Sequence, residues 1–302
     1  MLHVTNGTSV SLPQTGLPGG FVYWVDILHD GPVPAGLALE ELSRVRARFI
    51  SDFFDIPHAE ASFEARDEAL LAFRDHEEIV LWFEHDLYDQ LQLIQILDFL
   101  ATQDRGQTAV SLICGDEYLG PLQPAQLADL FETRHPVTPA EFETATAAWT
   151  AFCAPEPASL VDFLRHDTSA LPFLGAALRR HLQQFPSRRN GLARSELQIL
   201  SLVESGPHDS HSLFRANQDL EDWIYLGDTT FRRYVDTLAE ARNPLLATEV
   251  QRYVLTDAGR EVLHARQDHV RLNGINRWLG GVHLCQRAPI WRWDEQRASI
   301  HP

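Results

Sequence analysis

The stretch EIVLWF at residues 78–83, with the polar run EHDLYDQ at residues 84–90 behind it, decides the fold class of this chain. Its six residues do not alternate between apolar and polar, which is typical of a strand buried on both faces of a sheet. Apolar residues then recur at helical spacing, at Leu91, Ile94, Leu97 and Leu100. A buried strand, a polar turn and a helix in this order indicate an α/β fold.

Similar units lie on both sides of this stretch. Residues 2–5 and 21–28 are predicted as strands that end in the polar turns Asn6-Gly7 and His29-Asp30-Gly31-Pro32, and residues 109–114 as a short buried strand. Helical patterns occupy residues 40–54, 62–73, 124–133 and 139–152. We therefore expect a mostly parallel sheet with flanking helices in the first half of the chain.

Polar side chains gather where these strands end. Parallel strands joined by right-handed crossovers end at one edge of the sheet, which is where such folds bind ligands. The candidate ligand-binding residues at that edge are Asn6, Asp26, His29, Asp30, Glu84 and Gln90, and the candidate catalytic residues are His85, Asp86 and Asp89.

These imidazole and carboxylate groups suit two kinds of chemistry. They can bind a divalent metal ion, such as Zn²⁺, Mn²⁺ or Fe²⁺, or they can transfer protons, with His85 as base in a metal-assisted or acid/base hydrolase. Their spacing matches no strong metal motif, so the metal and its ligands stay open. Asp86 or Asp89 is equally well explained as a cap on the helix that follows, and His29-Asp30-Gly31-Pro32 as a rigid turn.

Charge divides the chain into two unequal halves. The formal net charge is −17, and all 25 basic residues are arginine, so chemistry that requires a lysine amine is excluded. Residues 1–150 carry 7 arginines against 24 acids, whereas residues 151–302 carry 18 of each. This acidity disfavours nucleic acid as a partner of the first half and favours a metal ion or a polar small molecule.

Cysteines and hydropathy bear on the location of the protein. The three cysteines, Cys114, Cys153 and Cys285, form no CxxC pair and cannot form a closed disulfide set. No export signal begins the sequence, and no apolar run is long enough to span a membrane. We therefore expect a reduced, cytoplasmic protein without a membrane partner.

A proline-rich segment, residues 154–158, predicts the boundary between two domains, at residues 1–153 and 158–302. The second is expected to be mainly helical, with helices over residues 195–204, 228–241 and 256–265 and a two-stranded hairpin over 244–255. This order resembles a winged helix-turn-helix. In a DNA-binding domain of that kind Arg232 and Arg233 on the 228–241 helix would contact the DNA. The neutral charge of this half also leaves a protein-contact role open.

The last residues are rich in tryptophan and arginine. The segments RWLGGVHL at residues 277–284 and WRWD at residues 291–294 carry three tryptophans and two arginines. Stacking of arginine on tryptophan makes them a candidate ligand platform. The alternative is a tail whose aromatic rings pack on the protein itself.

Several unusual strings together resemble one bacterial family. These are HVTNG at residues 3–7, WVDILHDGPVP at 24–34, WFEHDLYDQLQL at 82–93 and the RWLGGVHL and WRWD ending. They look like domain-of-unknown-function family 1835, whose defining domain covers the first half. The resemblance implies a bacterial origin and a two-part layout, but no reaction. This chain departs from the family in residues 11–20, which are rich in proline and glycine where the family continues into a helix.

Overall fold

The computed structural model describes residues 1–286 and 289–302 and divides the chain into two compact units. The first unit consists of Met1–Leu178 with Gly280–Val282, and the second of Arg179–Leu279 with His283–Pro302. The first unit therefore extends beyond the boundary that the prolines suggest, because the helix α6 (Ala158–Phe163) that follows them packs on α5 (Pro139–Cys153) of the same unit.

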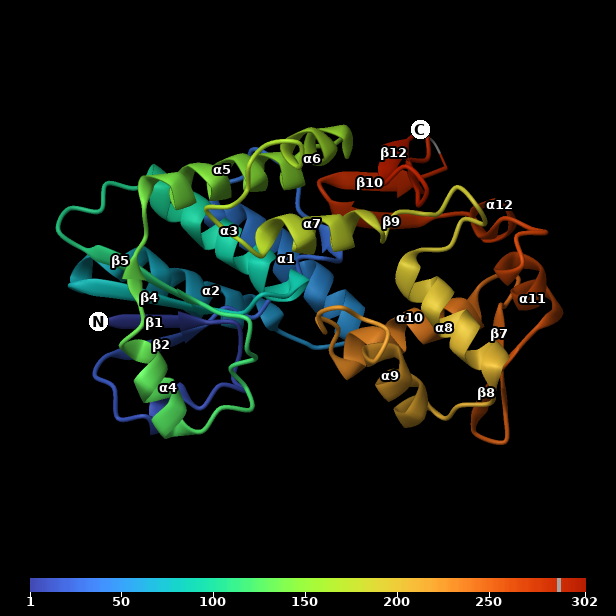
Figure 1. Cartoon of the computed structure of the whole chain (residues 1–302), viewed down its shortest axis with the longest axis horizontal. Coiled ribbons are helices and arrows are strands. Elements are labelled where there is room, and N and C mark those ends of the chain that lie inside the picture. The colour runs from blue at the N-terminus through green and yellow to red at the C-terminus, as the bar shows by residue number, and fades with distance from the viewer. Residues whose placement is uncertain (287–288) are drawn as a thin grey trace. The chain divides into compact units, whose positions relative to one another are not determined.

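The first unit is built on a five-stranded, mostly parallel sheet, as the sequence predicts (Figure 1). Its strand order is β2-β1-β4-β5-β6, and only the short β6 is antiparallel to its neighbour. The strands are β1 (Leu2–Thr5), β2 (Gly20–Tyr23), β4 (Glu78–Phe83), β5 (Ala109–Cys114) and β6 (His135–Pro136). The predicted second strand is too long: pairing ends when the Trp24 N–H donates to Thr5 O, and the chain then turns away from the sheet.

Helices cover both faces of this sheet. In Figure 1, α3 (Leu87–Thr102) lies over one face with α5 packed on its outer side, and α4 (Pro124–Phe131) lies against the other face. The face near α4 has an apolar core that includes Val80 and Trp82 of β4 and Leu127 of α4. The alternate side chains of β4 are thus buried on both faces, which explains why the strand has no polar position after Glu78.

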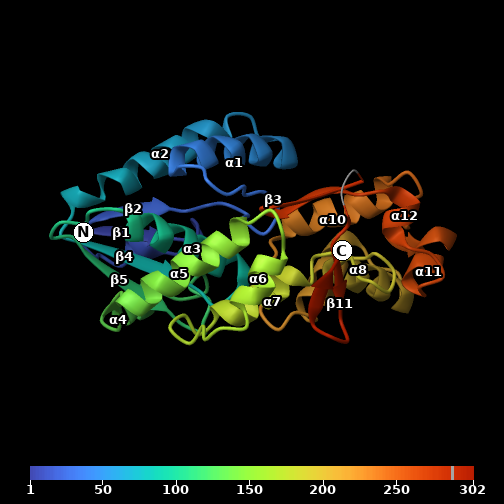
Figure 2. The ribbon, with the colours of Figure 1, turned by 90° about the horizontal axis from the view of Figure 1, so that it is seen from above.

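The helices α1 (Leu39–Phe54) and α2 (Ala59–Leu71) form a packed pair beside β2 (Figure 2). They are followed by the 3-10 turn η2 (Ala72–Asp75), and a second such turn, η1 (Leu12–Gln14), precedes β2. Residues 11–20, which the sequence marks as rich in proline and glycine, thus contain one short turn and no longer helix. The short strand β3 (Gly31–Pro32) and the start of α7 (Leu174–Leu182) complete the unit.

The second unit contains the predicted helices and hairpin. The helices α8 (Arg194–Ser205), α10 (Asp228–Glu240) and α11 (Asp257–Leu263) lie where the sequence places them, and β7 (Leu246–Glu249) pairs antiparallel with β8 (Arg252–Leu255). The sequence analysis missed α9 (Ser210–Gln218) and α12 (His269–Asn273). Four further strands were also missed: β9 (Asn276–Gly280), β10 (Val282–Cys285), β11 (Arg292–Asp294) and β12 (Ser299–His301).

The aromatic ending folds back on the protein. Trp293 is buried and its N–H and carbonyl bond to Pro186 and Arg188, while Trp278 stacks on His283 with ring centroids 4.4 Å apart. The three cysteines are free thiols. Among the described residues, no helix combines the length and the apolar character that a membrane crossing requires.

Candidate functional site

The parallel sheet reverses its direction of winding between β1 and β4. From β1 the chain moves to β2 on one side, and after α1 and α2 it returns to form β4 on the other side of β1. The carboxyl ends of β1 and β4, which are parallel neighbours, therefore lie side by side at a switch point of the winding. Ligands of open α/β sheets bind at such a switch point.

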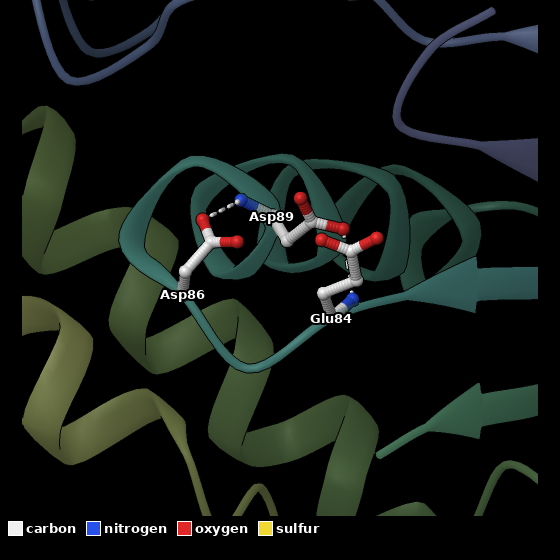
Figure 3. Close-up of side chains that lie close together, drawn as sticks. All are labelled: Glu84, Asp86 and Asp89. Carbon is white, nitrogen blue, oxygen red and sulfur yellow. Dashed lines mark hydrogen bonds between the residues drawn. The ribbon is translucent and has the colours of Figure 1, made fainter. Parts of the chain in front are cut away.

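Three acidic side chains of the β4–α3 turn lie close together at this switch point (Figure 3). Glu84 directly follows β4, Asp86 is the N-cap of α3, and Asp89 lies in the first turn of α3. One carboxylate oxygen from each lies within 4.8 Å of the others, and all three residues are buried. We refer to Glu84, Asp86 and Asp89 as the acid cluster.

Backbone hydrogen bonds fix two members of the acid cluster. Asp86 Oδ1 accepts from the Tyr88 N–H at 2.8 Å and the Asp89 N–H at 3.2 Å, so the predicted capping role of Asp86 is confirmed. Glu84 Oε1 accepts from the Leu119 N–H at 2.6 Å, in the loop after β5. Both capping hydrogen bonds end on Oδ1 of Asp86, and the residue still belongs to the acid cluster.

Asp89 is held from two directions. Its Oδ1 accepts from the Glu84 N–H at 2.8 Å, and its Oδ2 accepts from the side-chain amide of Asn6 at 2.7 Å. Asn6 follows β1 and is 8% exposed, and its Oδ1 is a buried acceptor with no hydrogen-bond partner among the described residues. The Tyr88 hydroxyl donates to the Asn6 backbone carbonyl at 3.1 Å, which fixes this turn against α3.

The carboxyl groups of the acid cluster ionise less readily than exposed carboxyl groups. Burial is the first cause that raises the pKa of all three carboxyl groups. Burial and the charge of Glu84 raise the pKa of Asp86 to about 7, and burial with the charges of Asp86 and Glu84 raises the pKa of Asp89 well above its usual range. In the described residues none of the three carboxylates forms an ion pair with an arginine or a histidine.

An ion with oxygen ligands fits this arrangement. Carboxylate and amide oxygens are the ligands that Mg²⁺, Mn²⁺ and Ca²⁺ prefer. Opposite oxygens around Ca²⁺ lie about 4.6–5.2 Å apart and those around Mg²⁺ about 4.2 Å apart, as twice the metal–oxygen distance gives. The spread of 4.8 Å within the cluster therefore requires little movement of the carboxylates.

The two other candidates of this turn, His85 and Gln90, lie outside the acid cluster. The His85 ring packs on Tyr118 and Phe173, with centroids 4.8 and 5.9 Å away, and it does not belong to the acid cluster. Burial lowers the pKa of His85. Gln90 donates to the Glu84 carbonyl at 2.7 Å and so supports the shape of the turn.

The candidates that follow β2 surround a buried arginine. Asp26 forms an ion pair with Arg46 of α1 at 2.7 Å, and both side chains are 0% exposed. Arg46 also donates to the Asp30 carbonyl at 2.8 Å, while the His29 ring lies edge-on to Tyr88 with centroids 6.2 Å apart. The carboxylate of Asp26 therefore faces α1. The hydrogen bond from Arg46 to the Asp30 carbonyl holds the turn at Asp30 against the same helix.

Sequence reasoning missed three residues of this region: Arg46, Tyr88 and Gln92. Gln92 donates to the Asp26 carbonyl at 2.9 Å, and its Oε1 is buried without a partner among the described residues. A signal for Gln92 was available, because glutamines at 90, 92 and 95 interrupt an otherwise apolar helix. Helical spacing also held a signal for Arg46, which lies four residues after Leu42 and three before Phe49 on the apolar face of α1, whereas its neighbours Arg44 and Arg48 are exposed.

The DNA-contact candidates lie in the second unit. Arg232 and Arg233 are exposed on α10, and Arg232 lines a groove of about 700 Å³ together with Arg215 of α9. They take no part in the acid cluster, which the first unit forms by itself.

A scan of protein-family models and a search of curated proteins both return no match for this chain.

Proposed function

We propose that the acid cluster binds a divalent metal ion and, through that ion, a polar small molecule at the switch point between β1 and β4. The observation that carries this proposal is the burial of three carboxylates within 4.8 Å of one another without a cationic partner among the described residues. Uncompensated buried charge is costly, and a bound cation removes that cost. The partnerless Oδ1 of Asn6 supplies a further acceptor beside the cluster.

Metal-dependent unfolding tests the proposal. Protein stripped of metal with a chelator is unfolded by heat with and without Mg²⁺, Mn²⁺ or Ca²⁺, and its metal content is measured after native purification. A ligand at a hundred times its Kd stabilises the folded state by about 2.7 kcal/mol. We expect one of these ions to raise the Tm of the wild type and to leave Asp89→Asn unchanged.

The matched control is Asp129→Asn, which removes an exposed carboxylate from α4. This variant should retain the full metal response. Equal responses of wild type and Asp89→Asn, or the absence of any response in the wild type, would contradict the proposal.

Metal-assisted hydrolysis is the second reading of the same site. A bound metal would supply an activated water molecule, and the acid cluster would hold the ion. The packing of His85 on Tyr118 and Phe173 gives less support to its role as the base. Metal-dependent release of nitrophenol from nitrophenyl phosphate, lost in Asp89→Asn, would favour hydrolysis over binding alone.

The groove between α9 and α10 supports a different candidate function for the second unit. Arg215 and Arg232 line it, and the order α8, α9, α10, β7, β8 resembles a winged helix. Such a domain would bind DNA through α10. Binding of a random duplex at low salt that weakens in Arg232→Gln would support this role. Membership of family 1835 and a cytoplasmic location also stay predictions.

A further inference from the structure

A cavity that is open to the surface lies in the first unit, at the opposite end of α3 from the acid cluster. It has a volume of about 550 Å³ and is lined by Ala101 at the end of α3, Arg105 in the following loop, and Val137, Phe142 and Thr146 from the β6–α5 region. Helices rise about 1.5 Å per residue, so Ala101 lies about 22 Å along α3 from Asp86. The cavity is therefore separate from the proposed metal site.

Arg105 is an unusual arginine for this part of the chain. Residues 1–150 contain 24 acids and 7 arginines, and four of these arginines, Arg46, Arg66, Arg74 and Arg134, form ion pairs. Arg44 and Arg48 are exposed, whereas Arg105 is half-buried. In the described structure the guanidinium of Arg105 has no ion pair, although Glu143 also lines the cavity, and its buried Nη1 has no hydrogen-bond partner.

The surroundings of Arg105 combine this charge with apolar surface. The guanidinium lies over the Phe142 ring at 4.2 Å from its centroid, which orients the group without satisfying its N–H donors. Ala101 and Val137 supply apolar wall, and the Thr146 hydroxyl is a further polar group of the lining. A buried donor that lacks a partner calls for an explanation, and a bound ligand provides one.

We propose that this cavity binds an organic carboxylate with an apolar body, whose carboxylate pairs with Arg105. A guanidinium matches the planar geometry of a carboxylate and can donate two parallel hydrogen bonds to it. The apolar part of the ligand would lie against Val137 and Ala101. A cavity of this size falls in the range of small-molecule sites, and a small number of polar groups in an apolar wall is their usual composition.

Octanoate, below its micellar concentration, is the probe that tests this proposal. Binding is measured by calorimetric titration of the whole chain in the presence of a chelator, so that the result does not depend on the metal site. We expect saturable binding of octanoate, and at least about tenfold weaker binding of octanol and octylamine, which share its apolar body but lack the carboxylate.

Variants then locate the site. Arg105→Gln should weaken octanoate binding by about tenfold or more, while Arg105→Lys, which keeps the charge, should retain part of it. Arg48→Gln removes an exposed arginine from α1 of the same unit and should bind as the wild type does. The Tm of each variant verifies that it is folded. Failure of octanoate to saturate the wild type, or equal affinity of wild type and Arg105→Gln, would overturn the proposal.

Discussion

The side-chain amide of Asn6 donates a hydrogen bond to Asp89 Oδ2 over 2.7 Å, although 83 positions separate the two residues. Asn6 follows β1 and Asp89 lies in the first turn of α3, so this bond joins the segments after β1 and β4 at the switch point of the sheet. It also brings Asn6 Oδ1, an acceptor without a hydrogen-bond partner among the described residues, next to the buried acid cluster.

Replacement of Asn6 tests this relationship. In Asn6→Leu the buried Asp89 carboxylate loses a donor, and an unsatisfied buried acceptor costs about 1–3 kcal/mol, so the metal-free protein should unfold at lower denaturant. The same variant should bind more weakly the metal ion that raises the Tm of the wild type. Gln103→Ala, which removes a partly exposed amide at the other end of α3, should change the free energy of unfolding by less than about 0.5 kcal/mol. Equal stability of the two variants would argue against the role of Asn6.

The strands that carry the candidate site could be predicted from the sequence. Which of the polar residues form the acid cluster could not. Residues 78–83 have only apolar interior positions and must be buried on both faces, so β4 and the polar turn behind it follow from the pattern. Asp26 and Asp86 are both acids near the end of a predicted strand, Asp26 within residues 21–28 and Asp86 in the turn after residues 78–83. Only the three-dimensional structure shows that Arg46 of α1 neutralises Asp26, while no arginine reaches Asp86 in the described residues.

The stability of the metal-free protein should fall as the pH rises through neutrality. Burial and the charge of Glu84 raise the pKa of Asp86 to about 7, whereas an unfolded Asp has a pKa of about 3.9. The folded state therefore binds more protons between these values, and the stability that the protonated group contributes is present below about pH 4 and lost as the pH passes about 7. Denaturant unfolding with chelator at pH 5 and pH 8 measures this change.

Asp86→Asn removes the titrating group but keeps an oxygen that can cap α3. The decrease in stability between pH 5 and pH 8 should therefore be smaller in Asp86→Asn than in the wild type. Asp129→Asn, which changes an exposed acid, should follow the wild-type curve. A decrease of the same size in all three proteins would show that other groups control the pH dependence.

The ion pair between Arg46 and Asp26 should be essential for stability. Both side chains are 0% exposed and 2.7 Å apart, so Arg46→Met would leave the Asp26 carboxylate buried without a counter-charge. Removal of one partner of a buried pair costs about 3–5 kcal/mol. Arg74→Met breaks a pair with Asp104 whose side chains are 54% and 84% exposed, and such pairs contribute about 0–1 kcal/mol. Urea unfolding measures the free energy of unfolding of the two variants. Similar decreases in both would contradict the importance of the buried pair.

Gly281 should tolerate no side chain, because it meets backbone at the end of α5. A Cβ atom built on Gly281 would lie 1.8 Å from the Cys153 carbonyl oxygen, and the Gly281 N–H already donates to the Phe152 carbonyl at 3.0 Å. Neither partner is a flexible side chain that can move aside, so Gly281→Ala should lower the free energy of unfolding by about 1–3 kcal/mol or more. Gly206→Ala is the control, since a Cβ there meets nothing within 4 Å and the backbone is extended. Thermal unfolding should show a clear decrease in Tm for Gly281→Ala alone; a wild-type Tm would mean that residues 280–282 do not pack on α5 as the structure shows.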